Sequence, residues 1–249
     1  MGPVVGLYRE LADAVSALSF QPPVEYVYNP LTYAWPAYHT YLRRFATPSK
    51  RVIFLGMNPG PFGMAQTGIP FGDVRTVGEW LGIRDELRDL PERMHAKRPI
   101  LGLSCRRIEV SGDRLWGWVR SRWCEPERFF DECFVANYCP LVFLEESGRN
   151  RTPDKLKPEE RSRLFSLCDE ALVRLVNLLE AEWLIAIGAF AEVRARECLG
   201  QLPGLRILRI LHPSPANPAA NRGWAGAVEE QLDEHGVFRI NEAESGGGS

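Results

Sequence analysis

The sequence predicts an α/β protein, a three-layer α/β/α sandwich around a mostly parallel four-stranded sheet. Four short apolar runs alternate with segments of helical periodicity, and strands that alternate with helices indicate parallel βαβ units. The runs are apolar nearly throughout, which is typical of strands covered on both faces. They are VIFL at 52–55, CFVAN at 133–137, WLIAIG at 183–188 and ILRIL at 207–211.

The predicted helices lie before, between and after these runs. The longest begins at Pro158, and its apolar residues recur at helical spacing at Leu164, Cys168, Leu172, Leu175 and Leu179. Shorter helices are predicted over 6–18, over 31–45 with an interruption at Pro36, over 73–81 with Asp73 as N-cap, over 189–199, and over 219–234 with Asn217 as a cap before Pro218. Segment 101–118 reads as a strand, a Ser-Gly-Asp turn and a helix.

Length and composition indicate one domain. The chain has 249 residues, of which 45% are hydrophobic, enough for a sizeable core. We expect a single domain over 1–240 and a flexible tail over 241–249. No apolar run approaches the roughly 20 residues of a membrane span, and the six cysteines show neither a CxxC nor a zinc-like spacing. We therefore expect an intracellular monomer with reduced thiols, in a bacterial cytoplasm or a eukaryotic nucleus, without membrane association, metal or cofactor.

The charge balance argues against a globally basic nucleic-acid binder. The net charge is −2 and the sequence pI is about 6.2, so contact with nucleic acid requires a local patch. The candidates are Arg43–Arg44, Lys97–Arg98, Arg106–Arg107, Arg149 with Arg151, and Arg222. Each of these, taken alone, is an ordinary solvated surface feature.

Three of the four runs end alike, each with one neutral polar side chain and a proline soon after. The residues are Asn58 before Pro59, Asn137 before Tyr138-Cys139-Pro140, and His212 before Pro213. Ligands of parallel sheets bind at the carboxyl ends of the strands. We therefore expect these three side chains to converge on one crevice beside the long glycine- and proline-rich loop over 55–74.

The constellation excludes several kinds of site. A glycosidase normally uses two carboxylates, and the predicted strand ends offer none. Neither GxxxxGK[ST] nor GxGxxG occurs. Each residue also has an ordinary structural interpretation: Asn58 as a turn cap, Asn137 as a loop brace, His212 as a satisfied histidine and Phe71 as part of the core. The shared placement at three strand ends favours a functional site.

Several segments resemble a known family. GMNPGPFGMAQTGIPFG at 56–72 and HPSPANPAANRGW at 212–224 are similar to the two signature motifs of the single-strand-selective monofunctional uracil-DNA glycosylases, within the uracil-DNA glycosylase superfamily. NYCPL at 137–141 and EVSGDRLWGW at 109–118 resemble further family segments, so the resemblance covers about 30–235. Other branches of the superfamily place an acidic residue where Asn58 stands.

The resemblance implies an enzyme that flips uracil, 5-hydroxymethyluracil and related oxidised uracils out of DNA and hydrolyses the N-glycosidic bond. It implies that Asn58 holds the attacking water and that His212 donates to the developing charge on uracil O2. Met57, Gly60, Phe71 and Asn137 would bind the base: Phe71 by stacking, Asn137 by reading the Watson–Crick edge, and Gly60 by leaving room beside C5. No lysine occupies a motif position, which predicts a monofunctional enzyme that leaves an abasic site.

The implied partner is uracil-containing DNA, both single- and double-stranded. The segment after His212 would contact it through Ser214, Pro215, Ala216, Asn217, Asn221 and Arg222. Ala216 departs from the larger residue that family members often carry at the wedge. Two other interpretations remain: a non-catalytic nucleic-acid or nucleotide-binding module on the same fold, and a nucleotide-hydrolysing enzyme, against which the absence of metal-binding carboxylates argues.

Overall fold

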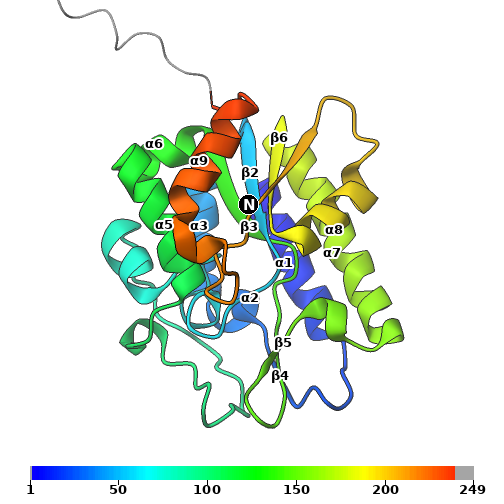
Figure 1. The fold of residues 1–249 in the computed structure, drawn as a ribbon. Helices are drawn as coiled ribbons and strands as arrows, with labels where there is room; N and C mark the ends of the chain where they lie inside the picture. The colour runs from blue at the N-terminus through cyan, green and yellow to red at the C-terminus, as the bar shows by residue number, and fades with distance from the viewer. Residues whose placement is uncertain (1, 239–249) are drawn as a thin grey trace, which may run out of the picture.

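The predicted fold class is confirmed by a computed structural model, which describes residues 2–238 (Figure 1). Four parallel strands form the central sheet in the order β3-β2-β6-β7. They are β2 (Val52–Gly56), β3 (Cys133–Asn137), β6 (Trp183–Ile187) and β7 (Arg206–Ile210). All four coincide with the predicted apolar runs to within a residue or two. The predicted tail over 241–249 lies outside the described residues.

Helices cover both faces of this sheet (Figure 1). On one side lie α5 (Val110–Trp123), α6 (Pro126–Glu132) and α9 (Trp224–Glu234), with α3 (Trp35–Phe45) beside α6. On the other lie α1 (Pro3–Ser16), α7 (Pro158–Leu179) and α8 (Ala189–Leu199). The five apolar positions predicted for α7 are all buried. The helices thus shield β2, β3 and β6, which are buried almost throughout, as the composition of the runs predicted. The edge strand β7 differs, because Arg206 and Arg209 are exposed.

Two predicted helices are broken where the backbone turns. Segment 31–45 divides at Ala34 into α2 (Pro30–Tyr33) and α3. The last helix begins only at Trp224, because Gly223 takes a left-handed conformation with φ 109°. Asn217 does accept a hydrogen bond from the Ala219 N–H, at 3.1 Å, but it lies before a short helical turn (Ala220–Arg222) and does not cap the last helix.

The prediction of a strand and a Ser-Gly-Asp turn within 101–118 is wrong. The chain runs irregularly after a 3-10 turn (Gly102–Ser104), and α5 starts at Val110, so the three residues belong to its first turn. Gly112 is required there by packing, since a Cβ atom at this position would lie 1.9 Å from the Phe71 carbonyl oxygen. The glycine therefore permits a close approach between α5 and the glycine- and proline-rich loop over 55–74, called the first loop below.

A second, antiparallel sheet was not predicted. It has the order β1-β4-β5 and consists of β1 (Tyr26–Tyr28), β4 (Val142–Leu144) and β5 (Asn150–Arg151). These strands are two or three residues long, too short to show a periodicity. The hairpin of β4 and β5 lies beyond the end of β3 and supplies a further wall of the site described below (Figure 1).

The first loop is tied down rather than open. It contains a single helical turn, α4 (Met64–Thr67), and the Tyr33 hydroxyl donates to the Ala65 carbonyl oxygen at 2.6 Å. Asp73 caps the next turn as predicted, its carboxylate accepting from the Thr76 N–H at 2.8 Å. That turn is a π-helical one (Thr76–Trp80). These contacts fix the loop on both sides of Phe71.

Candidate active site

The carboxyl ends of the parallel strands border a cavity of about 360 Å³. Seven of the predicted site residues line it, so the expected convergence is confirmed: Met57, Asn58, Gly60, Phe71, Asn137, His212 and Ser214. They come from the ends of β2, β3 and β7 and from the loop after β2. Pro215, Ala216, Asn217, Asn221 and Arg222 do not line the cavity and lie along the chain beyond Ser214.

Asn58 is held by a bond to the neighbouring loop. Its Nδ2 donates to the Leu141 carbonyl oxygen at 3.2 Å, which fixes the amide plane. The side-chain oxygen receives no hydrogen bond from the described residues and remains available to a small polar molecule in the cavity. The side chain is therefore oriented as an acceptor.

Asn137 carries an unsatisfied polar atom at the wall of the cavity. Its Oδ1 is buried without a hydrogen-bond partner among the described residues, and its Nδ2 contacts the Met64 sulfur at 3.2 Å. Sulfur is a weak acceptor, and an unpaired buried polar group costs about 1–3 kcal/mol. This amide is thus prepared to pair with a ligand that offers both a donor and an acceptor.

Phe71 lies near both Asn137 and His212 in the wall of the cavity. Its backbone φ of 57° is unusual for an aromatic residue, and backbone strain of this kind clusters at functional sites. A Cβ atom at Gly56 would lie 2.4 Å from Asn137 Oδ1 and 2.5 Å from the Phe71 ring. The ring centroids of Phe71 and His212 are 6.4 Å apart. The Phe71 ring, the Asn137 amide and the His212 imidazole therefore lie close together in the cavity wall.

The environment of His212 selects one neutral tautomer. Burial lowers the pKa of His212 below its usual value. Its Nδ1 accepts a hydrogen bond from the Ser214 N–H at 3.1 Å, so the ring proton is carried by Nε2. Gly188 packs against the ring, where a Cβ atom would approach His212 Cβ to 3.2 Å. His212 is therefore a preoriented hydrogen-bond donor.

Glu109 also lines the cavity and was missed by sequence reasoning, which found no carboxylate at the predicted strand ends. Burial raises the pKa of its carboxyl group, while the Phe62 N–H donates to Oε2 at 3.3 Å. A Cβ atom at Gly60 would lie 2.2 Å from Oε2, so the space beside Gly60 is occupied by this carboxyl group rather than open. Its place in EVSGDRLWGW, before a helix, was the available signal.

Two more lining residues come from the unpredicted hairpin. Asn150 and Thr152 face the cavity, whereas Arg151 between them pairs with Glu145 at 2.8 Å. The Asn150 Oδ1 is buried and has no partner among the described residues. The β5 strand thus adds a second unsatisfied amide to the site, and this could be found only from the structure.

The segment after His212 is folded on itself as a closed loop. Ser214 Oγ accepts from the Ala216 N–H at 3.2 Å, and Asn221 Nδ2 donates to the Pro215 carbonyl oxygen at 3.0 Å. Arg114, on α5, donates to the Pro213 carbonyl oxygen at 3.1 Å and to Asn221 Oδ1 at 2.8 Å. The amide of Asn221 therefore braces the loop.

The outer residues of the same segment are accessible. Pro215, Ala216 and Arg222 are exposed, and Asn217 is partly so. They form a rim next to the cavity. Ser214, which precedes them in the chain, lines the cavity itself. Among the residues from 2 to 238, no group of three or more His, Cys, Asp or Glu side chains lies together in a way that could hold a metal ion. No described helix is long and apolar enough to cross a bilayer.

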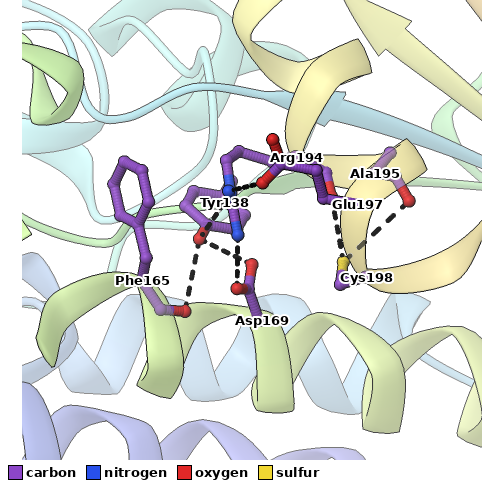
Figure 2. A network of polar contacts seen from close by, with 7 residues as sticks. All are labelled: Tyr138, Phe165, Asp169, Arg194, Ala195, Glu197 and Cys198. Carbon is purple, nitrogen blue, oxygen red and sulfur yellow. Dashed lines mark hydrogen bonds and ion pairs between the residues drawn. The ribbon is translucent and has the colours of Figure 1, made fainter. Parts of the chain in front are cut away.

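A polar network anchors the chain directly behind Asn137 (Figure 2). The Tyr138 hydroxyl donates to Asp169 at 2.7 Å and accepts from Arg194 Nε at 3.1 Å. Arg194 pairs in turn with Asp169 and with Glu197. This network joins the end of β3 to α7 and α8, and burial raises the pKa of Tyr138. The backbone of Asn137 is thereby held by three elements.

Removing Asp169 should destabilise the protein more than removing Glu197. The Asp169 side chain is 25% exposed and holds both Tyr138 and Arg194, which is 13% exposed, so Asp169→Ala leaves two polar groups without their partner. We expect a loss of roughly 2–3 kcal/mol in the free energy of unfolding. Glu197 is 57% exposed, and Glu197→Ala should cost less than about 1 kcal/mol. Urea unfolding of both variants measures the difference, and equal losses would contradict it.

The fold and the site define a class of protein. The family model described as the Uracil DNA glycosylase superfamily matches residues 44–231, and the chain belongs to that superfamily. The crystal structure of wild-type Pedobacter heparinus SMUG2 superimposes with a TM-score of 0.62 and covers 92% of this chain and 94% of that one. At 18% identity, that likeness shows the fold alone.

Closer relatives place the chain within one branch. It is 49% identical over 227 residues to the single-strand selective monofunctional uracil-DNA glycosylase of Rattus norvegicus, covering 91% of this chain and 81% of that protein. It is 48% identical over 231 residues to the counterpart from Bos taurus, covering 92% and 85%. The chain belongs to the family of single-strand selective monofunctional uracil-DNA glycosylases.

Proposed function

We propose that this protein is a DNA repair glycosylase that flips uracil out of DNA, hydrolyses its N-glycosidic bond and leaves an abasic site. The observation that carries the proposal is the unsatisfied Asn137 amide beside the Phe71 ring and the His212 imidazole. A flipped base must be stacked, read along its edge and bonded at the atom that gains charge. The family membership supports the same activity.

Asn137 would distinguish uracil from cytosine. Its amide oxygen can accept from uracil N3–H, and its Nδ2 can donate to O4. Cytosine presents the opposite pattern at these two atoms, and a site built to bond one pattern rejects the other by roughly 10⁴-fold. The Tyr138 network holds the backbone next to this amide. The side chain that would reject cytosine is therefore attached to a fixed backbone.

His212 and Asn58 would act on the two products of bond cleavage. When the C1′–N1 bond breaks, its electron pair passes to uracil, and negative charge gathers on O2. His212 Nε2–H donates to that oxygen. The cation left at C1′ forms a bond to the oxygen of a water held by the Asn58 side-chain oxygen, and the proton that this water loses passes to the uracil anion or to solvent. The Nδ2 of Asn58 is already bound to the Leu141 carbonyl oxygen. Asn58 is a weak base, so bond breaking leads and water addition follows.

The abasic product would remain uncut by the protein. Strand cleavage of the lyase type needs an amine that forms a Schiff base with the sugar. No lysine is among the residues that line the cavity in the described part of the chain. The enzyme is therefore monofunctional in this proposal. The proposal also includes a monomer that acts inside the cell without a metal or cofactor.

The pocket would also accept 5-hydroxymethyluracil and related oxidised uracils. Gly60 brings no side chain toward the base, and the cavity of about 360 Å³ exceeds the size of uracil alone. Because the Glu109 carboxyl group fills the space next to Gly60, a larger residue at position 60 would displace that group. The tolerance for substituents thus depends on two residues rather than on glycine alone.

Single-stranded DNA would be the preferred partner over duplex DNA. Ala216 is exposed at the rim, and a methyl group is too short to fill the gap left by an extruded base. Unstacking a base step costs a few kcal/mol, which a wedge partly offsets. A single strand needs no such compensation. Among duplexes, G·U mispairs should be better substrates than A·U pairs, because the mispair is weaker and the base is extruded at a lower cost.

Ala216→Arg should raise duplex activity more than single-strand activity. The longer side chain can enter the duplex, and its charge adds a phosphate contact at the rim. The measurement is single-turnover excision of uracil from matched single-stranded and duplex oligonucleotides at fixed salt. Arg222→Ala is the matched control, because it changes a rim charge without adding a wedge. A duplex-to-single-strand ratio that stays at the parental value in Ala216→Arg would show that another residue fills the gap.

The proposed activity is tested against the alternative of a non-catalytic binding module on the same fold. The protein is incubated with single-stranded DNA that carries one uracil, and abasic sites are then cleaved with alkali. We expect scission at the uracil position only when protein and alkali are both present. Binding without scission would favour the module, and scission without alkali would contradict monofunctional chemistry.

A further inference from the structure

Four basic residues near the cavity have no anionic partner. No carboxylate among the described residues lies within ion-pair distance of the following four, which we call the basic patch: Lys97, Arg98, Arg106 and Arg107. Three of the four are exposed, and Arg98 is partly so. The Arg98 Nε is buried and has no hydrogen-bond partner in the described part of the chain. In a chain of net charge −2, uncompensated cations gathered in one place favour binding of an anion from outside.

The Phe62 ring brings two of these cations together. The guanidinium carbons of Arg98 and Arg107 lie 5.1 and 4.1 Å from the centroid of that ring. The two charges are therefore closer to each other than the Debye length of about 10 Å at 0.1 M salt, and they repel. The face of an aromatic ring attracts each cation singly, whereas an anion bound to both would also relieve their repulsion. The pair is thus prearranged for an anionic ligand.

A buried side chain joins the basic patch to the wall of the cavity. The Gln66 Nε2 donates to the carbonyl oxygens of Pro61 and Pro99 at 2.9 and 3.0 Å. Its Oε1 accepts from the Leu101 N–H at 2.7 Å. Pro61 lines the cavity, and Pro99 directly follows Arg98 in the chain. The Gln66 amide therefore fixes the position of the patch relative to the cavity.

We propose that the basic patch binds the phosphate backbone of single-stranded DNA beside the flipped uracil, with Arg98 and Arg107 sharing one phosphate group. This inference rests on the proposed glycosylase function and adds to it a DNA contact that the rim does not supply. A guanidinium group binds phosphate through paired N–H donors, which is a strong, charge-assisted arrangement. The ligand class is therefore a phosphodiester of the strand that carries the uracil.

The rim and the basic patch adjoin different parts of the cavity wall. The rim follows Ser214, whereas the patch is tied to Pro61, and both of these residues line the cavity. Among the rim residues, Arg222 alone carries a charge, so a strand that also crosses the patch gains further phosphate contacts. Ile108, next to Arg107, is exposed and offers an apolar surface to an unstacked base. Because a duplex keeps its bases stacked inside, this combination suits a single strand.

The salt dependence of DNA binding tests for these phosphate contacts. The probe is a single-stranded oligonucleotide with one 2′-fluoro-2′-deoxyuridine, which resists hydrolysis because the fluorine destabilises a cation at C1′. Its affinity is measured by fluorescence anisotropy over a range of salt concentrations. In Arg107→Gln we expect the slope of log affinity against log salt to become shallower by about 0.7, the value of one phosphate contact on a single strand, and Kd to rise roughly three- to tenfold at low salt. Arg107→Lys should keep the parental slope, because the charge remains.

Arg206→Gln is the matched control. Arg206 also lies over an aromatic ring, 4.2 Å from the Trp183 centroid, but it pairs with Glu182 at 3.7 Å. It is the first residue of β7, whereas the cavity lies at the carboxyl ends of the strands. Its replacement removes the same charge and the same kind of ring contact, so the parental slope should remain. Equal changes of slope in Arg107→Gln and Arg206→Gln would report net charge alone and overturn the inference.

Shortening the probe on one side of the uridine at a time locates the contact along the strand. The difference in affinity between the parental protein and Arg107→Gln should disappear when nucleotides are removed from one side and persist when they are removed from the other. A difference that survives both truncations would overturn the inference, as would a parental slope in Arg107→Gln. Patch-dependent binding without excision of ordinary uracil by the parental protein would contradict the glycosylase function and still support the DNA contact.

Discussion

His212→Ala is expected to slow uracil excision by about 10²–10³-fold, because it removes a preoriented donor to the charge that develops on O2. The Ser214 N–H at 3.1 Å from Nδ1 holds the imidazole in the tautomer with the proton on Nε2. Single-turnover rates on single-stranded uracil DNA, at saturating protein, report the chemical step. Asn58→Ala should lose at least about 10²-fold in the same assay, through the water that it holds.

The loss should lie in chemistry and not in affinity. DNA binding, measured by fluorescence anisotropy with the same oligonucleotide, should change much less than the rate. His235→Ala is the matched control, since His235 is exposed after α9 and its imidazole Nδ1 hydrogen-bonds to the Gln231 carbonyl group of that helix. Parental rates in His212→Ala would remove His212 from the mechanism, and a fall in binding equal to the fall in rate would make it a DNA contact.

Gly56→Ala is expected to fold normally and still lose about 10²-fold in excision. The added methyl group would stand 2.4 Å from Asn137 Oδ1 and 2.5 Å from the Phe71 ring, so both groups must move. These are side-chain ends, which can shift at small cost to stability. A displacement of about 1 Å at a reacting site can nevertheless cost 10²-fold in rate.

Thermal unfolding and excision, measured on one preparation, test this combination. Gly226→Ala on α9 is the control, because a Cβ atom there meets no other atom within 4 Å and alanine is the better helix former. A Gly56→Ala protein that excises uracil at the parental rate would show that Asn137 and Phe71 do not hold the base above Gly56. A large drop in melting temperature would instead indicate that the end of β2 cannot adapt.

The central sheet was predictable because burial on both faces leaves a direct mark on composition. VIFL and WLIAIG contain almost nothing polar, and a run of that kind has few alternatives to a covered strand. The residues that follow such strands are then confined to one sheet edge by topology. For that reason the meeting of Asn58, Asn137 and His212 could be expected without coordinates.

The remaining parts depend on contacts between distant segments. Gly112 was predicted to form a turn, since glycine marks turns in general, but its reason is the carbonyl group of Phe71 in another loop. Glu109 enters the cavity because α5 begins one residue later and packs beside the first loop. Asn150 is placed by a two-residue strand that pairs with β4. None of these placements has a local pattern in the chain.

The pairing of β2 has a consequence for how the protein acquires activity. Val52 pairs with Cys133 on one side and with Trp183 on the other, so the strand that leads to Asn58 has no partner nearby in sequence. Parallel pairing over such separations requires long loops to close first and is intrinsically slow. During refolding, helical circular dichroism should therefore recover before excision does. The time at which catalytic activity recovers then reports the last event of folding, the closure of the sheet around β2.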